Sequence, residues 1–284
     1  GRSRMSVVIN TNYASVLARK NLAEVQRQMD KSVERLSSGK RINNAEDDAA
    51  GSAISGRMES QIRGLTMGIR HAKDGQSLVG TSEGAMQELN KILQRMRELA
   101  VQSASGVASS ADRNYLDLEM TQLFNEINSI SNNTKFNDQR ILTGATFTFY
   151  TDSDVAGTAI TTVAASASAQ NLLVSVTSVD ISSVTSNTST TGVQAVITQI
   201  DSALSVVDNR RAALGAVSNR FDHIIDNLQN VVMNTVQSQS RIVDADFSVE
   251  TTNLTRNTVL QQAATSMLAQ ANAQKNSILA LIQQ

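Results

Sequence analysis

The sequence predicts a mainly α-helical protein: an elongated antiparallel rod, or coiled-coil bundle, with one small β-rich insertion. Over several long segments, apolar residues alternate at steps of four and three, the spacing of a coiled-coil seam. The 284 residues include 0 Pro, which suits long uninterrupted helices. Between residues 143 and 191 Ser and Thr dominate and the only charged residues are aspartates, so this segment is predicted to be a separate insertion.

The longest seam lies between Val193 and Gln239, where a helix would be about 70 Å long at 1.5 Å per residue. Its apolar positions are Val193, Ile197, Ile200, Leu204, Val207, Leu214, Phe221, Ile225, Leu228 and Val232. A helix of this length cannot bury such a stripe alone. We therefore expect other segments of the chain to pack against it.

Two further helical segments are predicted to share that core. Residues 49–105 form the first, with a strict seam in its second half, and residues 112–130 form the second. Their seam positions are Ala85, Leu89, Ile92, Met96, Leu99, Leu116, Met120, Leu123, Ile127 and Ile130. We expect three antiparallel rods, from about 77–105, 112–131 and 193–239.

The two ends of the chain carry narrower stripes. A helix from Thr11 is predicted to end at Gly39, because glycine after the last apolar position is a common C-terminal stop. A final helix carries the other stripe, and Arg241–Phe247 is predicted to be the connector before it. We expect the two terminal helices to pair with each other and with neighbouring copies of the chain.

The insertion, residues 143–192, shows the period of two that is typical of strands at Ala145–Tyr150 and Leu172–Val179. It contains no histidine, lysine or arginine, which argues strongly against an active site there. Its Ser/Thr-rich surface is interpreted either as plain polar β structure or as a carrier of O-linked sugar.

Composition narrows the function classes further. With 25 Lys+Arg against 26 Asp+Glu, the chain lacks the basic excess of a nucleic-acid binder. It has 0 Cys, so disulfides and thiolate sites are excluded. No apolar run reaches the roughly 18 residues of a membrane span. The start of the chain also lacks the apolar core of a cleaved secretory signal.

Catalytic and metal chemistry find little support. His71 and His223 are isolated at helical positions, where packing or surface roles are the better interpretation. The acids at 46–48 lack the alternating ligand spacing of a calcium loop and are interpreted as a solvated helix start. We therefore predict no enzyme activity, no cofactor and no metal site.

Four stretches, in order along the chain, closely resemble bacterial flagellins. They are Met5–Leu22, Glu34–Gly51, Leu93–Ala104 and, at the far end, Asp244–Phe247 together with Gln261–Asn272. The chain departs from the family pattern at Asn137-Asp138, where Asn-Gly is usual, and its variable middle is very short.

The resemblance implies a domain plan. Residues 5–38 with 250–284 would form an inner coiled-coil assembly domain, and 39–51 with 240–249 would be connectors. Residues 52–142 with 193–239 would form the helical rod domain, carrying the insertion at 143–192, while residues 1–4 precede Met5, the expected start.

The resemblance also implies a function. The chain would be a structural subunit that self-assembles into the helical flagellar filament, the propeller of swimming motility. It would leave the cell without a cleaved signal peptide and act outside it. Its partners would be further copies of itself, the flagellar export apparatus, an export chaperone, and the hook-associated junction and cap proteins.

Two sets of site residues follow from this hypothesis. We expect the inner assembly contacts to be made by facing apolar residues of the terminal helices: Leu22, Val25, Met29, Val33 and Leu36 against Leu260, Met267, Ile278 and Leu281. Some flagellins are recognised by the flagellin-sensing Toll-like receptor of animals, and the contact motif of that recognition matches Gln94, Arg95, Leu99 and Glu119.

Two alternatives remain open. A hook–filament junction protein shares the terminal helices but caps or joins a filament instead of polymerising extensively by itself. A secreted helical effector would bind a host protein through the face formed by residues 77–131.

Overall fold

The computed structural model describes residues 12–144, 146–151, 159–163 and 190–282, with side chains as far as Ala273 in the last segment. The helices are α1 (Tyr13–Ser38), α2 (Ala49–Ser103), α3 (Ser110–Asn133), α5 (Thr190–Val243) and α6 (Phe247–Ile282). The strands are β1 (Lys135–Phe136), β2 (Gln139–Arg140), β3 (Thr146–Tyr150) and β4 (Ala159–Val163). The predicted mainly helical fold with a small β element is confirmed.

The chain divides into two units. The first combines Gly1–Ser60 with Asn234–Gln284, so it contains α1, α6 and the adjoining ends of α2 and α5. The second is Gln61–Met233 and contains the rest of α2 and α5 with α3 and the strands.

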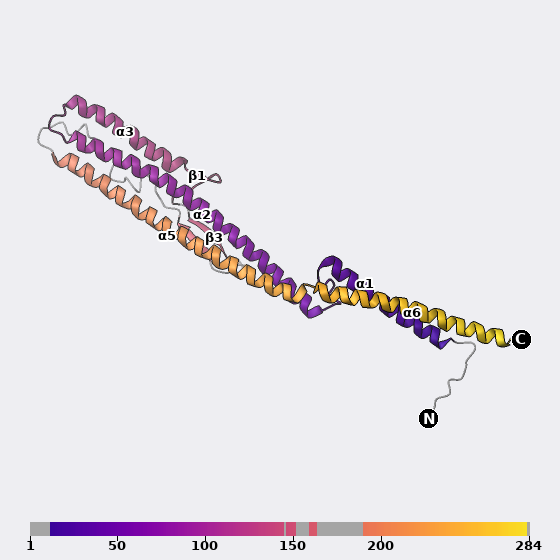
Figure 1. The fold of residues 1–284 in the computed structure, drawn as a ribbon. Coiled ribbons are helices and arrows are strands. Elements are labelled where there is room, and N and C mark those ends of the chain that lie inside the picture. Colours follow the sequence, from indigo (N-terminus) through magenta and orange to yellow (C-terminus); the bar gives the residue numbers. More distant parts are fainter. Residues whose placement is uncertain (1–11, 145, 152–158, 164–189, 283–284) are drawn as a thin grey trace. The chain divides into compact units, whose positions relative to one another are not determined.

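The second unit is built around one apolar core. Helices α2, α3 and α5 lie side by side in it (Figure 1). Residues from all three helices are fully or almost fully buried: Met86, Leu89, Leu93, Met96, Leu99, Met120, Ile127, Ile200, Val207, Leu214, Phe221 and Ile225. The three rods predicted from the four-three spacing therefore share a core, as expected.

Two antiparallel hairpins follow α3. In the first, β1 pairs with β2 across Asn137 and Asp138, which have φ values of 49° and 61°. Positive φ at both central residues is what a type I′ turn requires, and Asn and Asp tolerate it better than most residues. In the second hairpin β3 pairs with β4, Phe147 lying opposite Thr162. The predicted strand at Ala145–Tyr150 corresponds to β3, whereas Leu172–Val179 lies outside the described residues.

Strand β3 packs onto the helices through an aromatic contact. The ring of Phe149 meets Phe221 of α5 edge-on, with centroids 5.8 Å apart and planes at 86°. This geometry is the favoured one for aromatic pairs. On the other side, Nδ1 of His71 in α2 lies 3.0 Å from the carbonyl oxygen of Tyr150. His71 thus contacts the end of β3 through its ring, in line with the surface or packing role that its isolated position predicted.

Two glycines of α2 allow this close approach. A Cβ at Gly75 would lie 2.5 Å from Cζ of Phe221, and one at Gly68 would lie 2.7 Å from the carbonyl oxygen of Thr151. Neither position has room for a side chain. The absence of side chains at Gly68 and Gly75 therefore lets α2 pack directly against the ring of Phe221 and the backbone of Thr151, while α2 stays helical.

The ends of the terminal helices are capped. Gly39 ends α1 in the left-handed region, with φ 70°, and its N–H donates to the carbonyl of Arg35. The predicted stop at Gly39 is thereby confirmed. The predicted connector Arg241–Phe247 was too long, because α5 continues to Val243 and α6 begins at Phe247. Oδ1 of Asp246 accepts the N–H of Ser248 at 2.8 Å and so allows the early start of α6.

Candidate functional site

Helices α1 and α6 form an antiparallel pair within the first unit. Three cross-helix hydrogen bonds fix their register: Nδ2 of Asn12 donates to the carbonyl of Ala271 at 3.1 Å, Nε2 of Gln261 donates to Oε1 of Gln26 at 2.7 Å, and Nη1 of Arg35 donates to Oε1 of Glu250 at 2.9 Å. Positions on α6 fall as positions on α1 rise. The pair is therefore antiparallel with a single register along its described length.

The seam between the two helices keeps the four-three spacing but is unusually polar. On α1 its buried and half-buried positions are Ser15, Ala18, Leu22, Val25, Met29, Ser32 and Leu36. On α6 they are Glu250, Leu254, Asn257, Gln261, Ala264, Leu268 and Ala271. Small and polar residues in a coiled-coil seam reduce its stability but specify its register.

The structure places the predicted α1 residues unequally. Leu22, Val25, Met29 and Leu36 lie on the seam, half-buried against α6. Val33 is 49% exposed, and the adjacent Ser32, only 5% exposed, takes the seam position instead. A ladder built from apolar residues alone passed over the serine.

Two of the predicted α6 residues, Leu260 and Met267, lie beside the seam with α1 instead of on it. Leu260 is 44% exposed and Met267 is 65% exposed, because the seam passes through the neighbouring positions Gln261 and Leu268. Neither residue therefore packs in the seam, and their role in the inner assembly contacts stays a prediction. The side chains of Ile278 and Leu281 lie outside the described residues.

Exposed apolar side chains remain on the outer surface of the pair. Val249, Val259, Leu260 and Met267 of α6 are each at least 44% exposed, as are Tyr13, Val16 and Leu17 of α1. We call these seven residues the outer apolar surface. A pair of amphipathic helices buries one stripe from each, so these remaining apolar side chains are available for a further protein contact.

One ion pair is partly buried in the seam. The side chain of Glu250 is 8% exposed and that of Arg35 is 23% exposed, with 2.9 Å between Nη1 and Oε1. Nε of Arg35 is buried and has no hydrogen-bond partner. Sequence reasoning missed this pair because neither residue belongs to an apolar ladder.

The segment between α1 and α2 is fastened by Asp47. Its Oδ1 lies 2.6 Å from Nζ of Lys31, and its Oδ2 accepts the N–H groups of Asn43 and Asn44, both at 3.2 Å. The hydrogen bond to Lys31, assisted by those two N–H groups, lowers the pKa of the Asp47 carboxyl from 3.8 to about 2. Asp47 therefore holds the segment between α1 and α2 against helix α1.

Backbone bonds join the same segment to the end of α5. The N–H of Arg41 donates to the carbonyl of Val243 at 2.6 Å, and the N–H of Ala245 donates to the carbonyl of Gly39 at 3.0 Å. The two chain segments that lead into α2 and α6 are thus tied side by side. Within the described residues, no group of three His, Asp or Glu side chains is arranged to hold a metal ion.

The lowered pKa of Asp47 predicts a pH dependence. The folded carboxyl stays ionised down to about pH 2, whereas the unfolded one protonates near 3.8. The stabilisation by Asp47 is therefore complete above about pH 4 and is lost as the pH falls towards 2. The difference in melting temperature between the wild type and Asp47→Asn, followed by circular dichroism, should be constant above that range and shrink below it. A difference that stays the same down to the acid end would contradict the assignment.

The predicted receptor residues lie in the second unit. Arg95 is about half exposed and bonds to Glu119 at 2.9 Å and to Glu98 at 3.1 Å, which raises the pKa of its guanidinium. Exposed Gln94 donates to Oδ1 of Asn90 at 2.8 Å.

Leu99 differs from these residues. It is 0% exposed and belongs to the core. It is inaccessible to a partner of the folded chain. We therefore correct the prediction: Leu99 packs in the core beneath the other receptor residues and is not a contact residue.

Both helical ends of the chain match models of a known protein family. Residues 9–146 match the family model described as "Bacterial flagellin N-terminal helical region", and residues 197–282 match the "Bacterial flagellin C-terminal helical region". Neither model covers residues 147–196, which include most of the segment interpreted as an insertion.

Curated relatives match nearly end to end. A flagellin of Halalkalibacterium halodurans is 40% identical over 97% of this chain and 100% of its own length. A flagellin of Bacillus subtilis is 37% identical over 96% of this chain and 99% of its own length. A solved structure from Vibrio parahaemolyticus, assigned provisionally to the flagellar hook-associated proteins, matches 70% of this chain and 100% of its own with a TM-score of 0.62. At 13% identity that last match reports the fold alone.

No helix among the described residues is both long and apolar enough to cross a membrane.

Proposed function

The chain belongs to the bacterial flagellin family, the structural subunits of the flagellar filament, and from this premise we propose that the α1–α6 pair is the element through which its copies polymerise. The observation that carries the proposal is the outer apolar surface. It lies on the two helices whose other faces are already occupied by each other. A neighbouring copy is the partner that every filament subunit meets at high local concentration.

A contact of this kind supports a helical polymer. When the surface that one copy offers differs from the surface it receives, the contact repeats without closing and generates a filament. The polar seam fixes the α1–α6 register, so the outer residues are presented in one fixed pattern. The supercoil that turns rotation into thrust then arises from small shifts between alternative packings of such interfaces.

The remaining assignments follow from family membership. Residues 5–38 with 250–284 act as the assembly domain, and 52–142 with 193–239 act as the rod. The connectors are the shorter segments that join the helices, 39–48 and 244–246. The chain passes through the flagellar export apparatus with an export chaperone and works outside the cell. Hook-associated junction proteins and cap proteins contact the filament at its two ends.

Met267→Asp tests the proposal directly. Met267 is 65% exposed, so a charge there leaves the folded chain unchanged but blocks a dry contact between copies. We expect no filaments by electron microscopy, together with an unaltered helical circular dichroism signal. Leu36→Asp, on the seam, should have the same effect on filaments.

The matched control is Val107→Asp, at a residue that is 93% exposed and lies between α2 and α3. This variant should polymerise like the wild type. Normal filaments from Met267→Asp would refute the assembly role of the outer apolar surface.

Recognition by the flagellin-sensing receptor is assigned to Gln94, Arg95 and Glu119. All three are exposed on adjacent helices, and the bond between Arg95 and Glu119 holds them as one patch. Arg95→Ala and Glu119→Ala monomers should signal less in a receptor reporter assay. Full potency in both would remove the assignment.

A further inference from the structure

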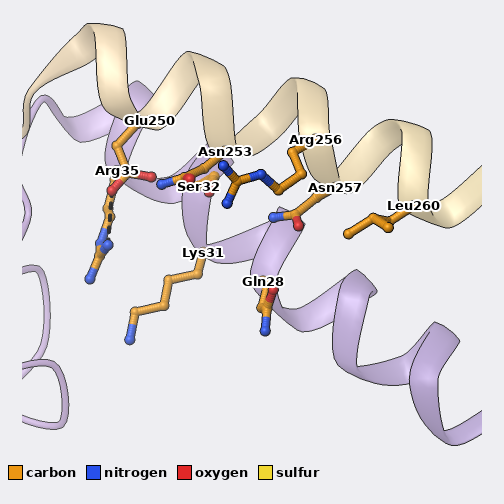
Figure 2. A pocket seen from close by; sticks show the side chains of 9 residues that line it. All are labelled: Gln28, Lys31, Ser32, Arg35, Glu250, Asn253, Arg256, Asn257 and Leu260. Carbon is orange, nitrogen blue, oxygen red and sulfur yellow. Dashed lines mark hydrogen bonds and ion pairs between the residues drawn. The ribbon is translucent and has the colours of Figure 1, made fainter.

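Two grooves of opposite charge lie against α1 in the first unit. The first, between α1 and α6, is lined by Gln28, Lys31, Ser32, Arg35, Glu250, Asn253, Arg256, Asn257 and Leu260 (Figure 2). It holds three cationic side chains against a single carboxylate. We call it the basic groove.

The second groove lies on the neighbouring face of α1, beside the segment that leads into α2. Its lining residues are Arg27, Asp30, Lys31, Glu34, Asn44, Glu46 and Asp47. Four carboxylates face two cations there. We call it the acidic groove, and Lys31 is the residue that the two grooves share.

Most of these charges are already neutralised within the chain. Lys31 pairs with Asp47, and Arg35 pairs with Glu250. In Figure 2 the Arg256 side chain extends from α6 over the basic groove, between Asn253 and Asn257. Arg256 forms no hydrogen bond or ion pair with any other described residue.

The acidic groove has the complementary excess. Arg27 pairs with Glu24, outside the groove, and Glu34 accepts a hydrogen bond from Asn44 at 3.3 Å. Glu46 is exposed and, in the described part of the chain, has no such bond of its own. Arg256 in the basic groove and Glu46 in the acidic groove are therefore opposite charges with no hydrogen bond or ion pair in the described residues, whereas Asp30 and Glu34 accept hydrogen bonds from neutral amides.

We propose that the basic groove of one copy receives the acidic groove of the next, with Arg256 of the first copy paired to Glu46 of the second. The proposal rests on the filament function above and names a specific contact within it. The two grooves occupy neighbouring faces of α1. When a copy uses its basic groove toward one neighbour and its acidic groove toward another, the contact is heterologous and does not close. Repeated from copy to copy, it propagates a polymer. Charge complementarity also opposes a wrong register, because like grooves would repel.

Charge reversal with rescue by mixing tests the pair. Arg256→Glu and Glu46→Arg should each raise the critical concentration for seeded polymerisation about fivefold to tenfold, since each replaces an attraction with a repulsion. The double variant should return to the wild-type value. An equal mixture of the two single variants should also polymerise near the wild-type value, because each repels itself and attracts the other.

The mixing result cannot arise from a contact inside one chain, so it identifies the partner as a second copy. The matched control is Arg19→Glu, the same charge reversal at an exposed α1 residue outside both grooves, which should leave the critical concentration unchanged. Polymerisation of the wild-type protein, measured in the same assay, separates a failure of the filament function from a failure of the groove pairing. If the wild type fails to polymerise, the filament function itself is wrong.

If the wild type polymerises, three results would overturn the groove pairing alone. One is normal polymerisation of both single variants. Another is a loss that neither the double variant nor the mixture restores, which would give the grooves another occupant. The third is an equal loss in Arg19→Glu, which would show a general effect of net charge.

Discussion

Phe221→Ala is expected to lower the free energy of unfolding of the second unit by about 3–5 kcal/mol, as the removal of a large buried aromatic side chain does in other cores. Phe221 is 0% exposed, fits against Gly75 and meets the ring of Phe149. Its loss leaves a cavity where α2, α5 and β3 converge. Urea unfolding of the purified monomer, followed by circular dichroism, measures the change.

The matched control is Val206→Ala, on the same helix at a residue that is 38% exposed, which should stay within about 0.5 kcal/mol of the wild type. Phe149→Ala and the double variant complete a cycle. The edge-on contact should appear as a coupling of about 0.5–1.5 kcal/mol. A Phe221→Ala loss no larger than that of the control would contradict the convergence of the three elements at this ring.

Arg35→Ala is expected to have the second-largest effect. Removing one member of a fully buried ion pair costs about 3–5 kcal/mol, because the other charge stays buried without a partner. Arg35 is 23% exposed, so solvent screens part of this loss. We expect a loss of about 2 kcal/mol. Because polymerisation requires the ordered α1–α6 pair, this loss raises the critical concentration by at most roughly thirty-fold.

The double variant Arg35→Met with Glu250→Leu should recover most of the loss, because a pair of apolar residues carries no desolvation cost. The exposed pair of Arg27 and Glu24 provides the control, with side chains that are 70% and 53% exposed. Arg27→Ala should change the critical concentration less than twofold. An Arg35→Ala protein with the wild-type threshold, or a double variant no better than the single one, would show that the pair does not support the seam.

The sequence predicted the long helices and the shared core because apolar periodicity is a direct record of burial. Phe221 and Met96 were identified from spacing alone and are fully buried. The periodicity also located the β3 strand through its alternation. Neither result needed knowledge of the partner segments.

The α1–α6 seam was harder to predict. Ser32 and Asn257 are each 5% exposed, and Glu250 is 6% exposed, yet residues of these types usually face water. Glu250 bonds to Arg35, 215 positions away, and Ser32 and Asn257 are buried where α1 and α6 meet. No local pattern reveals contacts between segments so far apart in the sequence. A ladder restricted to apolar residues therefore selected Val33 beside the seam residue Ser32 and Leu260 beside Gln261. It also selected Met267 instead of the neighbouring Leu268.

The receptor patch shows a similar limit. The motif that suggested Leu99 is a local run of sequence, whereas burial depends on the three-dimensional core. The β1–β2 hairpin was missed for a different reason. Its turn uses Asn137 and Asp138 at positive φ, without the glycine that usually announces such a turn.

Seeded polymerisation tests the central claim most directly. Heat-dissociated monomer is mixed with short filament seeds and imaged by negative-stain electron microscopy. A self-assembling flagellin subunit is predicted to extend the seeds into long tubes of uniform width. Persistent monomer with seeds that are merely capped would contradict this account and would support a hook–filament junction protein instead.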